Sequence, residues 1–450
     1  MSANNDVIVA IASPPGMGAV SLIRVSGPRA FEVCEAAVRA KRSVAAMENR
    51  KATLATVVNA KGETLDEALI TPFKGPGSFT GEDVVEFACH GGVLVTRRVL
   101  DRLLELGARA ADAGEFSKRA FEHGKLDLTQ AEAIMDLISA QTDLAMRAAH
   151  EQLQGKLGDQ SESLRESMIE VVAHVEAYID FPEEDIDPAT GDVLTDKIDT
   201  IVQGIDRMLS TADQGRILRE GVRTVICGEP NVGKSSLLNS LLGYERAIVS
   251  DIAGTTRDTL EEVVNVKGIP LRLIDTAGVR DAGDSIEKKG IERSEAQIKM
   301  ADLIIEVVDG SSAGECLLDE SMVEGRHHVV VMNKGDLGLD PCWSKVKGVN
   351  ISCAEQTGLE LLSDHLAEIL SMSNAVMGGH VVAINARHQD CLKRAKEFLL
   401  KAKEGFVDFM GAEFVSLDLR EALEAVGEIA GRVDTEEIFD EIFGTFCIGK

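Results

Sequence analysis

The sequence predicts a multidomain fold of α/β plus α parts, in which an N-terminal α/β domain is followed by a discontinuous helical domain that a second α/β domain interrupts. Three observations lead to this prediction. The chain has 450 residues, too many for one hydrophobic core at about 150 residues per domain. Strand-like apolar runs mark residues 1–122 and 221–375. Apolar residues recur at helical spacing in 123–220 and 376–450.

The N-terminal domain, 1–122, is predicted from β-rich runs that turn residues divide. Pro14-Pro15-Gly16 separates the first two runs, and Gly91-Gly92 separates the last run from an amphipathic helical pattern over 93–106. The predicted strands cover residues 7–12, 19–25, 52–58 and 83–90. Several polar residues stand at strand ends here, a place where ligands often bind.

The helical domain is predicted in two parts, 123–220 and 376–450. The first part opens with Thr129-Gln130-Ala131-Glu132, a pattern typical of a capping box, and apolar residues then follow one helical face as far as Ala148. Further helices are predicted over 161–179, over 193–212 and from Ala386 to the end of the chain. These helices cannot enclose a large core separately, so we expect the C-terminal ones to pack on those of 126–218.

Composition limits the partners and the compartment. The chain carries 47 basic and 75 acidic residues, for a net charge of -28, which opposes nucleic-acid binding over the whole surface. Its eight cysteines form no CxxC pair, so neither a zinc site nor a disulfide framework is indicated. No signal peptide and no run of about eighteen apolar residues is present. We expect a cytoplasmic protein that does not enter a membrane.

The inserted domain, 221–375, begins with a phosphate-binding loop. Gly228-Glu229-Pro230-Asn231-Val232-Gly233-Lys234-Ser235 fits GxxxxGK[ST], and it lies between a strand-like run and a helical pattern. The backbone N–H groups of such a loop surround the α- and β-phosphates at the N-terminus of the following helix. Lys234 would reach the β- and γ-phosphates, and Ser235 would hold Mg²⁺. The predicted nucleotide-binding residues in this loop are Asn231, Val232, Gly233, Lys234, Ser235 and Ser236.

Base selection is predicted at Asn333-Lys334-Gly335-Asp336, an NKxD motif after a buried-strand pattern. The Asp336 carboxylate can accept hydrogen bonds from N1–H and the 2-amino group of guanine, neither of which adenine offers. Asn333, Lys334 and Asp336 therefore favour GTP over ATP. Ser352-Cys353-Ala354 stands where a SAK-like base-contacting loop is expected, and its departure from that pattern leaves the contact open.

Two further stretches predict a Ras-like P-loop GTPase domain. Asp275-Thr276-Ala277-Gly278 supplies a DxxG element that would place Asp275 near Mg²⁺ and the Gly278 N–H near the γ-phosphate. Thr255 and Thr256 are candidates for a first switch, in which Thr256 would complete the Mg²⁺ coordination only when the γ-phosphate is present.

The residue after DxxG is Val279, where many small GTPases have a glutamine that orients the attacking water. A valine cannot bind water, so another group must do this. Glu287 is a candidate because a carboxylate can orient or polarise a water. The alternative is that Glu287 is a solvated carboxylate at the start of a helix.

These motifs, the interrupted helical domain and the terminal Cys447-Ile448-Gly449-Lys450 closely resemble the MnmE (TrmE) family of tRNA-modification GTPases over essentially the whole chain. The N-terminal domain carries further family-like segments, which are Pro14-Pro15-Gly16, Phe79-Thr80-Gly81-Glu82-Asp83, His90-Gly91-Gly92, Gly114-Glu115-Phe116-Ser117 and Lys125-Leu126-Asp127-Leu128.

The resemblance implies a homodimer, joined through N-terminal domains that bind a tetrahydrofolate derivative, whose GTPase domains approach each other with GTP and K⁺. It places K⁺ ligands at Asn231, Ser250, Ile252 and Thr255, the first, second and fourth of which also belong to the predicted GTP site. It also gives Glu287 the water-organising role. The folate-contacting positions that it implies are Arg24, Glu86, Lys125 and Lys450.

Cys447 is a lone thiol near the C-terminus. It is either a small buried apolar residue or a participant in the modification chemistry, and the sequence leaves both open.

The function that the resemblance implies is a K⁺-stimulated GTPase that works with an FAD-dependent partner, MnmG, in a heterotetramer or larger complex. Together they would add a carboxymethylaminomethyl or aminomethyl group at C5 of the wobble uridine of certain tRNAs, with 5-formyl- or 5,10-methylene-tetrahydrofolate as one-carbon donor. FAD would belong to the partner, because this chain has no GxGxxG fingerprint. Two alternatives are a ribosome-assembly GTPase and a GTP-gated scaffold whose folate pocket is vestigial.

Overall fold

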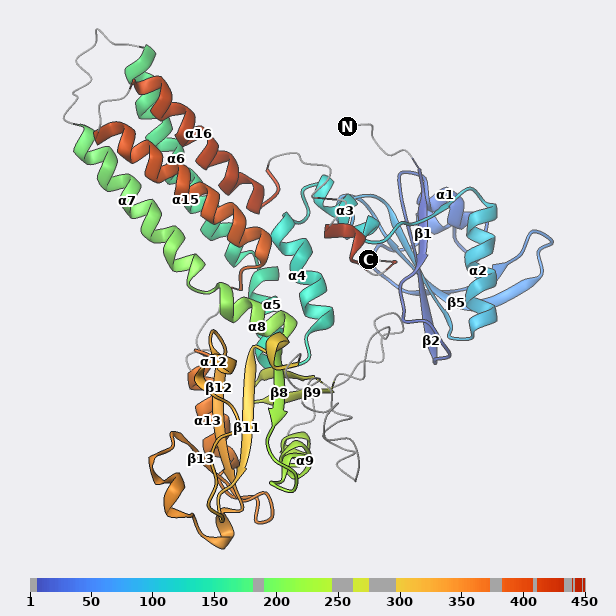
Figure 1. Ribbon diagram of the computed structural model, residues 1–450. Helices are drawn as coiled ribbons and strands as arrows, with labels where there is room; N and C mark the ends of the chain where they lie inside the picture. Colours follow the sequence, from blue (N-terminus) through green and yellow to red (C-terminus); the bar gives the residue numbers. More distant parts are fainter. Residues whose placement is uncertain are drawn as a thin grey trace. The chain divides into compact units, whose positions relative to one another are not determined.

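The computed structural model describes residues 6–180, 190–244, 262–274, 297–372, 383–407, 411–432, 439, 442–446 and 448–449. They belong to two compact units (Figure 1). The N-terminal unit combines residues 1–135 with 430–450, and the second unit comprises 136–429. Among the described residues, no helix has both the length and the apolar character needed to cross a membrane.

The N-terminal unit is built on a seven-stranded sheet in the order β3-β4-β5-β6-β2-β1-β7. Its strands are β1 (Ile8–Ile11), β2 (Val20–Ser26), β3 (Val38–Arg39), β4 (Thr53–Val58), β5 (Thr64–Phe73), β6 (Val84–His90) and β7 (Arg109–Ala110). All neighbours are antiparallel except β1 and β7. The four predicted strands are confirmed as β1, β2, β4 and β6, and the sheet also contains β3, β5 and β7, which were not predicted.

Helices cover both faces of this sheet. The described helices of the unit's sheet region are α1 (Ala30–Glu35), η1 (Val44–Ala46), α2 (Val93–Glu105) and α3 (Glu115–Glu122). Val33 of α1 and Leu103 of α2 share a buried cluster with Phe87. Phe116 of α3 packs with Ala10 in another cluster. Alternate residues of a strand point to opposite faces of the sheet. The helix α3 therefore covers the face to which Ala10 and its cross-strand partners point.

The C-terminal residues complete the N-terminal unit. Phe443 packs with Leu128 in a cluster of aromatic and aliphatic side chains, and Phe121 lies 5.0 Å from Phe439 between ring centroids. Ile448 forms an antiparallel bridge with Ala113. Beyond residue 429 the described part of the chain is helical only at 439 and 442–444, and a β-bridge follows at Ile448, so the prediction of helix as far as the chain end is only partly correct.

The second unit contains a bundle of long helices. Its helices are α5 (Asp143–Leu153), α6 (Lys156–Asp180), α7 (Thr190–Leu209), α8 (Ala212–Glu220), α15 (Ala386–Val407) and α16 (Ala412–Ile429), and α4 (Leu128–Ser139) enters the unit with its last residues. Met168, Ile198, Leu399 and Leu419 come from α6, α7, α15 and α16 and share one buried cluster. The predicted packing of the C-terminal helices on the earlier ones is confirmed.

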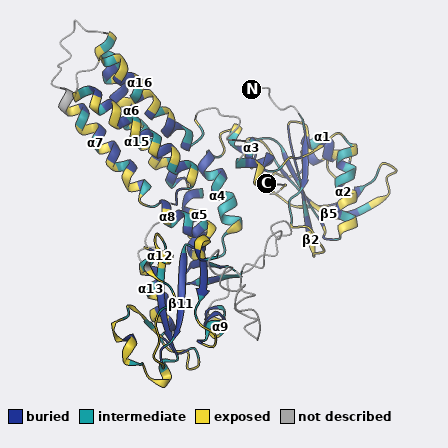
Figure 2. Cartoon of the chain, in the orientation of Figure 1, coloured by how far each residue is buried: buried dark blue, intermediate teal, exposed yellow. Residues whose placement is uncertain are grey.

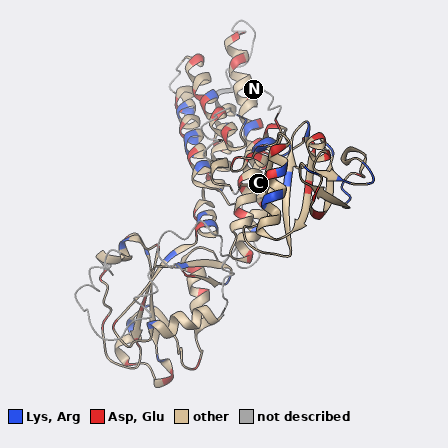
Figure 3. Cartoon of the chain, turned by 90° about the vertical axis from the view of Figure 1, so that its right-hand side faces the viewer, with Lys and Arg blue, Asp and Glu red and all other residues tan. Residues whose placement is uncertain are grey.

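Ion pairs join these helices on the outside of the bundle, where Figure 3 shows basic and acidic residues interspersed. Lys396 of α15 lies 2.6 Å from Asp206 of α7, and Arg420 of α16 lies 2.7 Å from Glu176 of α6. Exposed pairs of this kind contribute at most about 1 kcal/mol each. The buried apolar cluster therefore supplies most of the bundle's stability.

Two predictions about the first helices of this region are corrected. The capping box is Asp127 with Gln130, not Thr129 with Glu132: Asp127 Oδ1 accepts from the Gln130 N–H at 2.8 Å, and Gln130 Oε1 accepts from the Asp127 N–H at 2.9 Å. The predicted continuous helix through Ala148 is two helices, α4 and α5. Thr142 ends the continuity, because its hydroxyl accepts from the Ala145 N–H and starts a new helix.

A six-stranded sheet in the order β13-β12-β11-β8-β10-β9 forms the rest of the second unit. Its elements are β8 (Val222–Cys227), α9 (Lys234–Tyr244), β9 (Glu262–Val266), β10 (Ile269–Leu273), β11 (Leu303–Asp309), α12 (Glu320–Val323), β12 (His327–Asn333), η2 (Gly335–Leu337), η3 (Pro341–Lys345), β13 (Gly348–Asn350) and α13 (Leu359–Ile369). All strands are parallel except the antiparallel pair β9 and β10.

This sheet is covered on both faces, and Figure 2 shows β11 buried. Leu237 of α9 and Leu362 of α13 pack with Val331 on one face, whereas Val225 faces Ile298 on the other. The mixed α/β and α fold class is therefore confirmed. In such a sheet, ligands bind beyond the carboxyl ends of the parallel strands, where β8, β11 and β12 end.

Candidate functional site

The phosphate loop connects β8 to α9, and two glycines determine its shape. Gly228 has φ +140°, and a Cβ there would lie 2.1 Å from the Val307 carbonyl oxygen. Gly233 has φ +103°, and its Cβ would lie 2.1 Å from Asn333 Nδ2. No side chain fits at either position. The loop is thus packed against β11 and β12, with its N–H groups leading into the first turn of α9.

Lys234 lies across this loop. Its ammonium donates to the carbonyls of Gly228 at 2.8 Å and Glu229 at 2.7 Å. Burial lowers the pKa of Lys234. The two hydrogen bonds nevertheless hold the ammonium at the mouth of the loop, where phosphate oxygens can replace the carbonyls as acceptors. Ser235, in the first turn of α9, is half-buried beside it.

The NKxD motif is joined directly to the phosphate loop. Asn333 ends β12, and its Nδ2 donates to the Val232 carbonyl at 2.9 Å. Its Oδ1 accepts from the Cys353 N–H at 3.1 Å. One amide side chain therefore joins the loop that fits phosphates, the NKxD motif and the loop at 352–354. The predicted phosphate and base residues lie at one edge of the sheet.

Ser352, in the loop that departs from the SAK-like pattern, contacts the NKxD motif. Its hydroxyl donates to Asp336 Oδ1 and accepts from the Glu355 N–H at 3.1 Å. Asp336 is exposed, so its orientation depends on this bond. The arrangement presents a carboxylate whose free oxygen can accept from a guanine edge.

Asp309 is a site residue that the sequence patterns do not single out. It ends β11, and its Oδ2 accepts from Lys334 Nζ at 2.6 Å. Burial by itself would raise the pKa of Asp309, but hydrogen bonds from Lys334 and Ser311 hold that pKa below its ordinary value. Asp309 could have been identified from its position, because it is an acidic residue at the carboxyl end of a central strand next to β8, where ligands bind.

In the N-terminal unit, two of the four predicted folate positions contact each other. Arg24 on β2 and Glu86 on β6 are cross-strand partners, with Nη2 to Oε1 at 2.8 Å. Arg24 Nη1 lies 3.4 Å from the Gly449 carbonyl, and its guanidinium lies 5.7 Å from the Phe79 ring centre and 5.8 Å from that of Phe116. Neither charge is fully buried, so an aromatic-lined ion pair faces outward on the α3 face of the sheet.

Lys125 reaches the same region through the Lys74–Glu82 loop, which carries Phe79. Lys125 Nζ donates to the Pro76 carbonyl at 3.0 Å. Cations, a carboxylate and the exposed Phe79 ring are therefore close together, and this set of groups fits the chemistry of an anionic aromatic ligand.

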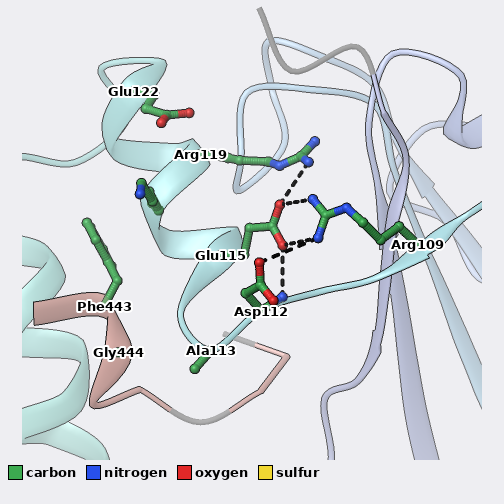
Figure 4. Close-up of a pocket in the computed structure, with 9 residues that line it drawn as sticks. Arg109, Asp112, Ala113, Glu115, Arg119, Glu122, Phe443 and Gly444 are labelled. Atoms are coloured by element: carbon green, nitrogen blue, oxygen red, sulfur yellow. Dashed lines mark hydrogen bonds and ion pairs between the residues drawn. The ribbon is translucent and has the colours of Figure 1, made fainter. Parts of the chain in front are cut away.

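A hollow of about 350 Å³ also lies in this unit, and Figure 4 shows its lining. Arg109, Glu115 and Arg119 form its charged wall. Arg119 Nη2 lies 3.0 Å from Glu115 Oε1, and Arg109 Nη2 lies 2.6 Å from the same atom. The described folate positions Arg24, Glu86 and Lys125 do not line it. Its charges bind one another, so we assign this wall a structural role.

Several predicted residues lie outside the described part of the chain. They are Ser250, Ile252, Thr255, Thr256, Asp275, Thr276, Ala277, Gly278, Glu287, Cys447 and Lys450. Val279 lies outside it too. Their roles stay predictions.

Comparison with known proteins covers nearly the whole chain. Residues 7–125 match the family model described as GTP-binding protein TrmE N-terminus, and 128–447 match the model described as MnmE helical domain. The chain is 47% identical over 447 residues to the tRNA modification GTPase MnmE of Akkermansia muciniphila, covering 98% of each chain. It is 45% identical over 450 residues to that of Aquifex aeolicus, covering 98% of this chain and 99% of the relative. A solved G domain of the T. maritima FeoB iron transporter is 29% identical, covers 33% of this chain and 98% of its own, and has a TM-score of 0.25.

Proposed function

Because the chain belongs to the MnmE family of tRNA-modification GTPases, we propose that it hydrolyses GTP to drive the modification of C5 of the wobble uridine in certain tRNAs. One observation carries the nucleotide half of this proposal. Asn333 Nδ2 lies 2.9 Å from the Val232 carbonyl, so the guanine-selecting motif and the phosphate loop form one site. The tRNA half rests on the family.

The chain's own residues prepare this site for GTP. The loop from Gly228 to Lys234 offers N–H groups and an ammonium to the phosphates, and Asp336 offers a carboxylate to the base. Ser235 and Thr256 would hold Mg²⁺, and Asn231, Ser250, Ile252 and Thr255 would hold K⁺. Such cations neutralise the charge that develops between the β- and γ-phosphates. Glu287 would orient the water, a task that Val279 cannot perform.

The proposal extends to partners and cofactors. A homodimer would join a cytoplasmic, MnmG-type partner that carries FAD, in a heterotetramer or larger complex, and tetrahydrofolate bound near Arg24, Glu86, Lys125 and Lys450 would donate the one-carbon unit. The product would be a carboxymethylaminomethyl or aminomethyl uridine. The Arg24–Glu86 pair, flanked by Phe79 and Phe116, supports the ligand class through its chemistry.

The wobble uridine of cells that lack this chain tests the function directly. Nucleoside mass spectrometry should show loss of the C5 modification, and the intact gene should restore it. A gene carrying Glu287→Ala should not. Unchanged modification in the deletion strain would contradict the proposal, and a ribosome-subunit assembly defect in its place would favour the ribosome-assembly alternative.

Hydrolysis in K⁺ and Na⁺ tests the catalytic arrangement. We expect turnover to be about ten-fold or more faster in K⁺, because the smaller ion does not fit donors arranged for K⁺ and leaves the leaving-group charge less neutralised. Glu287→Ala should lower turnover roughly 100-fold in K⁺. Glu292→Ala, which changes another acid in the same segment, is the matched control and should leave turnover unchanged. Equal rates in the two salts would exclude the potassium role.

A further inference from the structure

Two cations, Arg50 and Lys125, contact one loop of the N-terminal unit, and a third, Lys74, begins that loop. Arg50 precedes β4, Lys74 follows β5 and Lys125 follows α3. All three are exposed. Lys125 donates to the Pro76 carbonyl at 3.0 Å, and Arg50 Nη2 donates to the Gly77 carbonyl, which is the next carbonyl of the Lys74–Glu82 loop. Two cations are thus held at adjacent peptide groups.

The Lys74–Glu82 loop is anchored from within the unit. The hydroxyls of Ser26 and Thr80, both fully buried, lie 2.7 Å apart. Ser26 also donates to Glu82 Oε2 at 2.7 Å, and Ser78 donates to the Glu82 carbonyl. The carbonyls that hold Arg50 and Lys125 therefore have a defined position.

Arg50 is also held by its own backbone. Its φ is +61°, in the left-handed region that side chains other than glycine occupy at a cost of the order of 1 kcal/mol. The Arg50 N–H donates to the Pro72 carbonyl at 2.8 Å, and the Lys74 N–H donates to Asn49 Oδ1 at 2.9 Å. These two bonds join the turn before β4 to the end of β5, so that Arg50 and Lys74 are presented together.

The same loop leads to the proposed folate site. Its Phe79 ring lies 5.7 Å from the Arg24 guanidinium, and Arg24 binds Glu86. A ligand whose ring system lies at Arg24 and Phe79 would therefore extend along the loop toward Lys125, Lys74 and Arg50.

The local charge favours an anionic chain. Two acids of the neighbouring segments have partners of their own: Glu48 binds Lys51, and Asp83 Oδ1 accepts from the Gly75 N–H at 3.0 Å. Arg50 and Lys125 each use one N–H donor to bind a carbonyl. Further donors can bind a ligand, because a guanidinium has five N–H groups and an ammonium has three. These remaining donors are available to carboxylates of a ligand, in a chain whose net charge is -28.

We propose that Arg50, Lys74 and Lys125 bind the γ-linked glutamate tail of an oligoglutamyl tetrahydrofolate. The inference rests on the proposed folate site and names the form of folate that the site prefers. Each added glutamate contributes one carboxylate on a flexible chain, and three cations on three segments match two or three such carboxylates. A tRNA backbone is less well matched, because the cations form a small cluster beside an aromatic ion pair.

Calorimetric titration of the full chain with 5-formyl-tetrahydrofolate tests this, using the monoglutamate and the triglutamate. The triglutamate should bind roughly five-fold more tightly, the effect expected of two or three exposed ion pairs, and the difference should shrink at high salt. Arg50→Gln and Lys74→Gln should each remove much of the preference, with monoglutamate affinity little changed for Lys74→Gln. Lys61→Gln is the matched control, because Lys61 is an exposed cation in the turn at the opposite end of β4.

The outcomes separate the inference from the proposed function. Equal affinity for both ligands would overturn the tail-binding role and leave the folate site intact. Binding of neither ligand by a chain with native circular dichroism would overturn both, and would favour a vestigial pocket. A preference that survives Arg50→Gln and Lys74→Gln while tRNA affinity falls would assign the cations to RNA and overturn the inference.

Discussion

Asp336→Asn is expected to lower GTP affinity about a thousand-fold and to create affinity for xanthosine triphosphate. In the proposed GTP site the carboxylate would accept two guanine donors, and hydrogen bonds to a charged group contribute about 1.5–3 kcal/mol each. An asparagine faces the 2-amino group of guanine with its own N–H donors. Xanthine has a carbonyl at that position, which the asparagine can satisfy while its oxygen accepts from N1–H. Competition binding with both nucleotides measures the change.

The control for this variant is Ser352→Ala. The Ser352 hydroxyl donates to Asp336 Oδ1, so its loss should misorient the carboxylate and weaken GTP binding several-fold, without changing which base is preferred. Trp343, the one tryptophan in the sequence, lies buried in the same sheet domain and reports its unfolding by fluorescence. Asp336 is exposed, so neither the fluorescence nor its melting midpoint should change. Undiminished GTP affinity in Asp336→Asn would exclude guanine selection at this site.

Arg119→Met is expected to destabilise the N-terminal unit by about 3–5 kcal/mol. Arg119 is 1% exposed and binds three carboxylates. Its Nη1 lies 3.1 Å from Glu82 Oε1, and its Nη2 lies 2.7 Å from Asp6 Oδ1 and 3.0 Å from Glu115 Oε1. Methionine keeps much of the volume but leaves the buried Glu82 without this cation, whereas Glu115 and Asp6 keep only Arg109. Native-state hydrogen exchange of α3 and β6 amides in the full chain measures the loss.

The loss should depend on pH. Burial by itself would raise the pKa of Glu115, but hydrogen bonds from Arg109, the Asp112 N–H and Arg119 hold that pKa below its ordinary value of 4.5. A lowered carboxyl pKa contributes stability above the unfolded-state pKa and loses it as pH falls through the folded-state pKa. The difference between wild type and Arg119→Met should therefore be complete above about pH 5 and shrink below about pH 4.

Arg97→Met is the matched control, because the Arg97–Asp101 pair is exposed, with side chains 67% and 46% accessible. Its loss should cost less than about 0.5 kcal/mol. The Trp343 transition, which reports the other unit, should be the same in both variants. A loss of under about 1 kcal/mol for Arg119→Met would show that the buried network does not hold the unit together.

Local sequence patterns correctly predicted helices and strands that depend on residues adjacent along the chain. The strand-like run 224–227 before the phosphate loop became β8, and the pattern over 93–106 became α2, because periodicity reports which face is buried. The error at the capping box is also local. Asp127 and Thr129 both precede a suitable partner, and an aspartate is at least as good an N-cap as a threonine. Because α4 begins at Leu128, Asp127 is the N-cap and Thr129 lies within the helix.

Tertiary contacts decided how the site parts meet. The Asn333–Val232 bond spans 101 positions and the Arg24–Glu86 pair spans 62, and no local pattern carries such pairings. The contacts of Asp309 and Ser352 with the NKxD motif could be seen only in the folded sheet, where the parallel strands end at one edge. The same holds for Arg119, a charged residue that sequence statistics place at the surface.

The sequence alone determined that this chain binds a nucleotide, favours guanine and interrupts a helical domain with a GTPase domain, since each follows from residues adjacent along the chain. Tertiary contacts were needed to show that the C-terminal aromatic residues complete the N-terminal unit, that Arg24 and Glu86 bind each other, and that Arg50 and Lys125 donate to adjacent carbonyls of one loop. The physical reason is that burial and pairing of these side chains depend on strand register and loop packing, which join residues far apart in sequence.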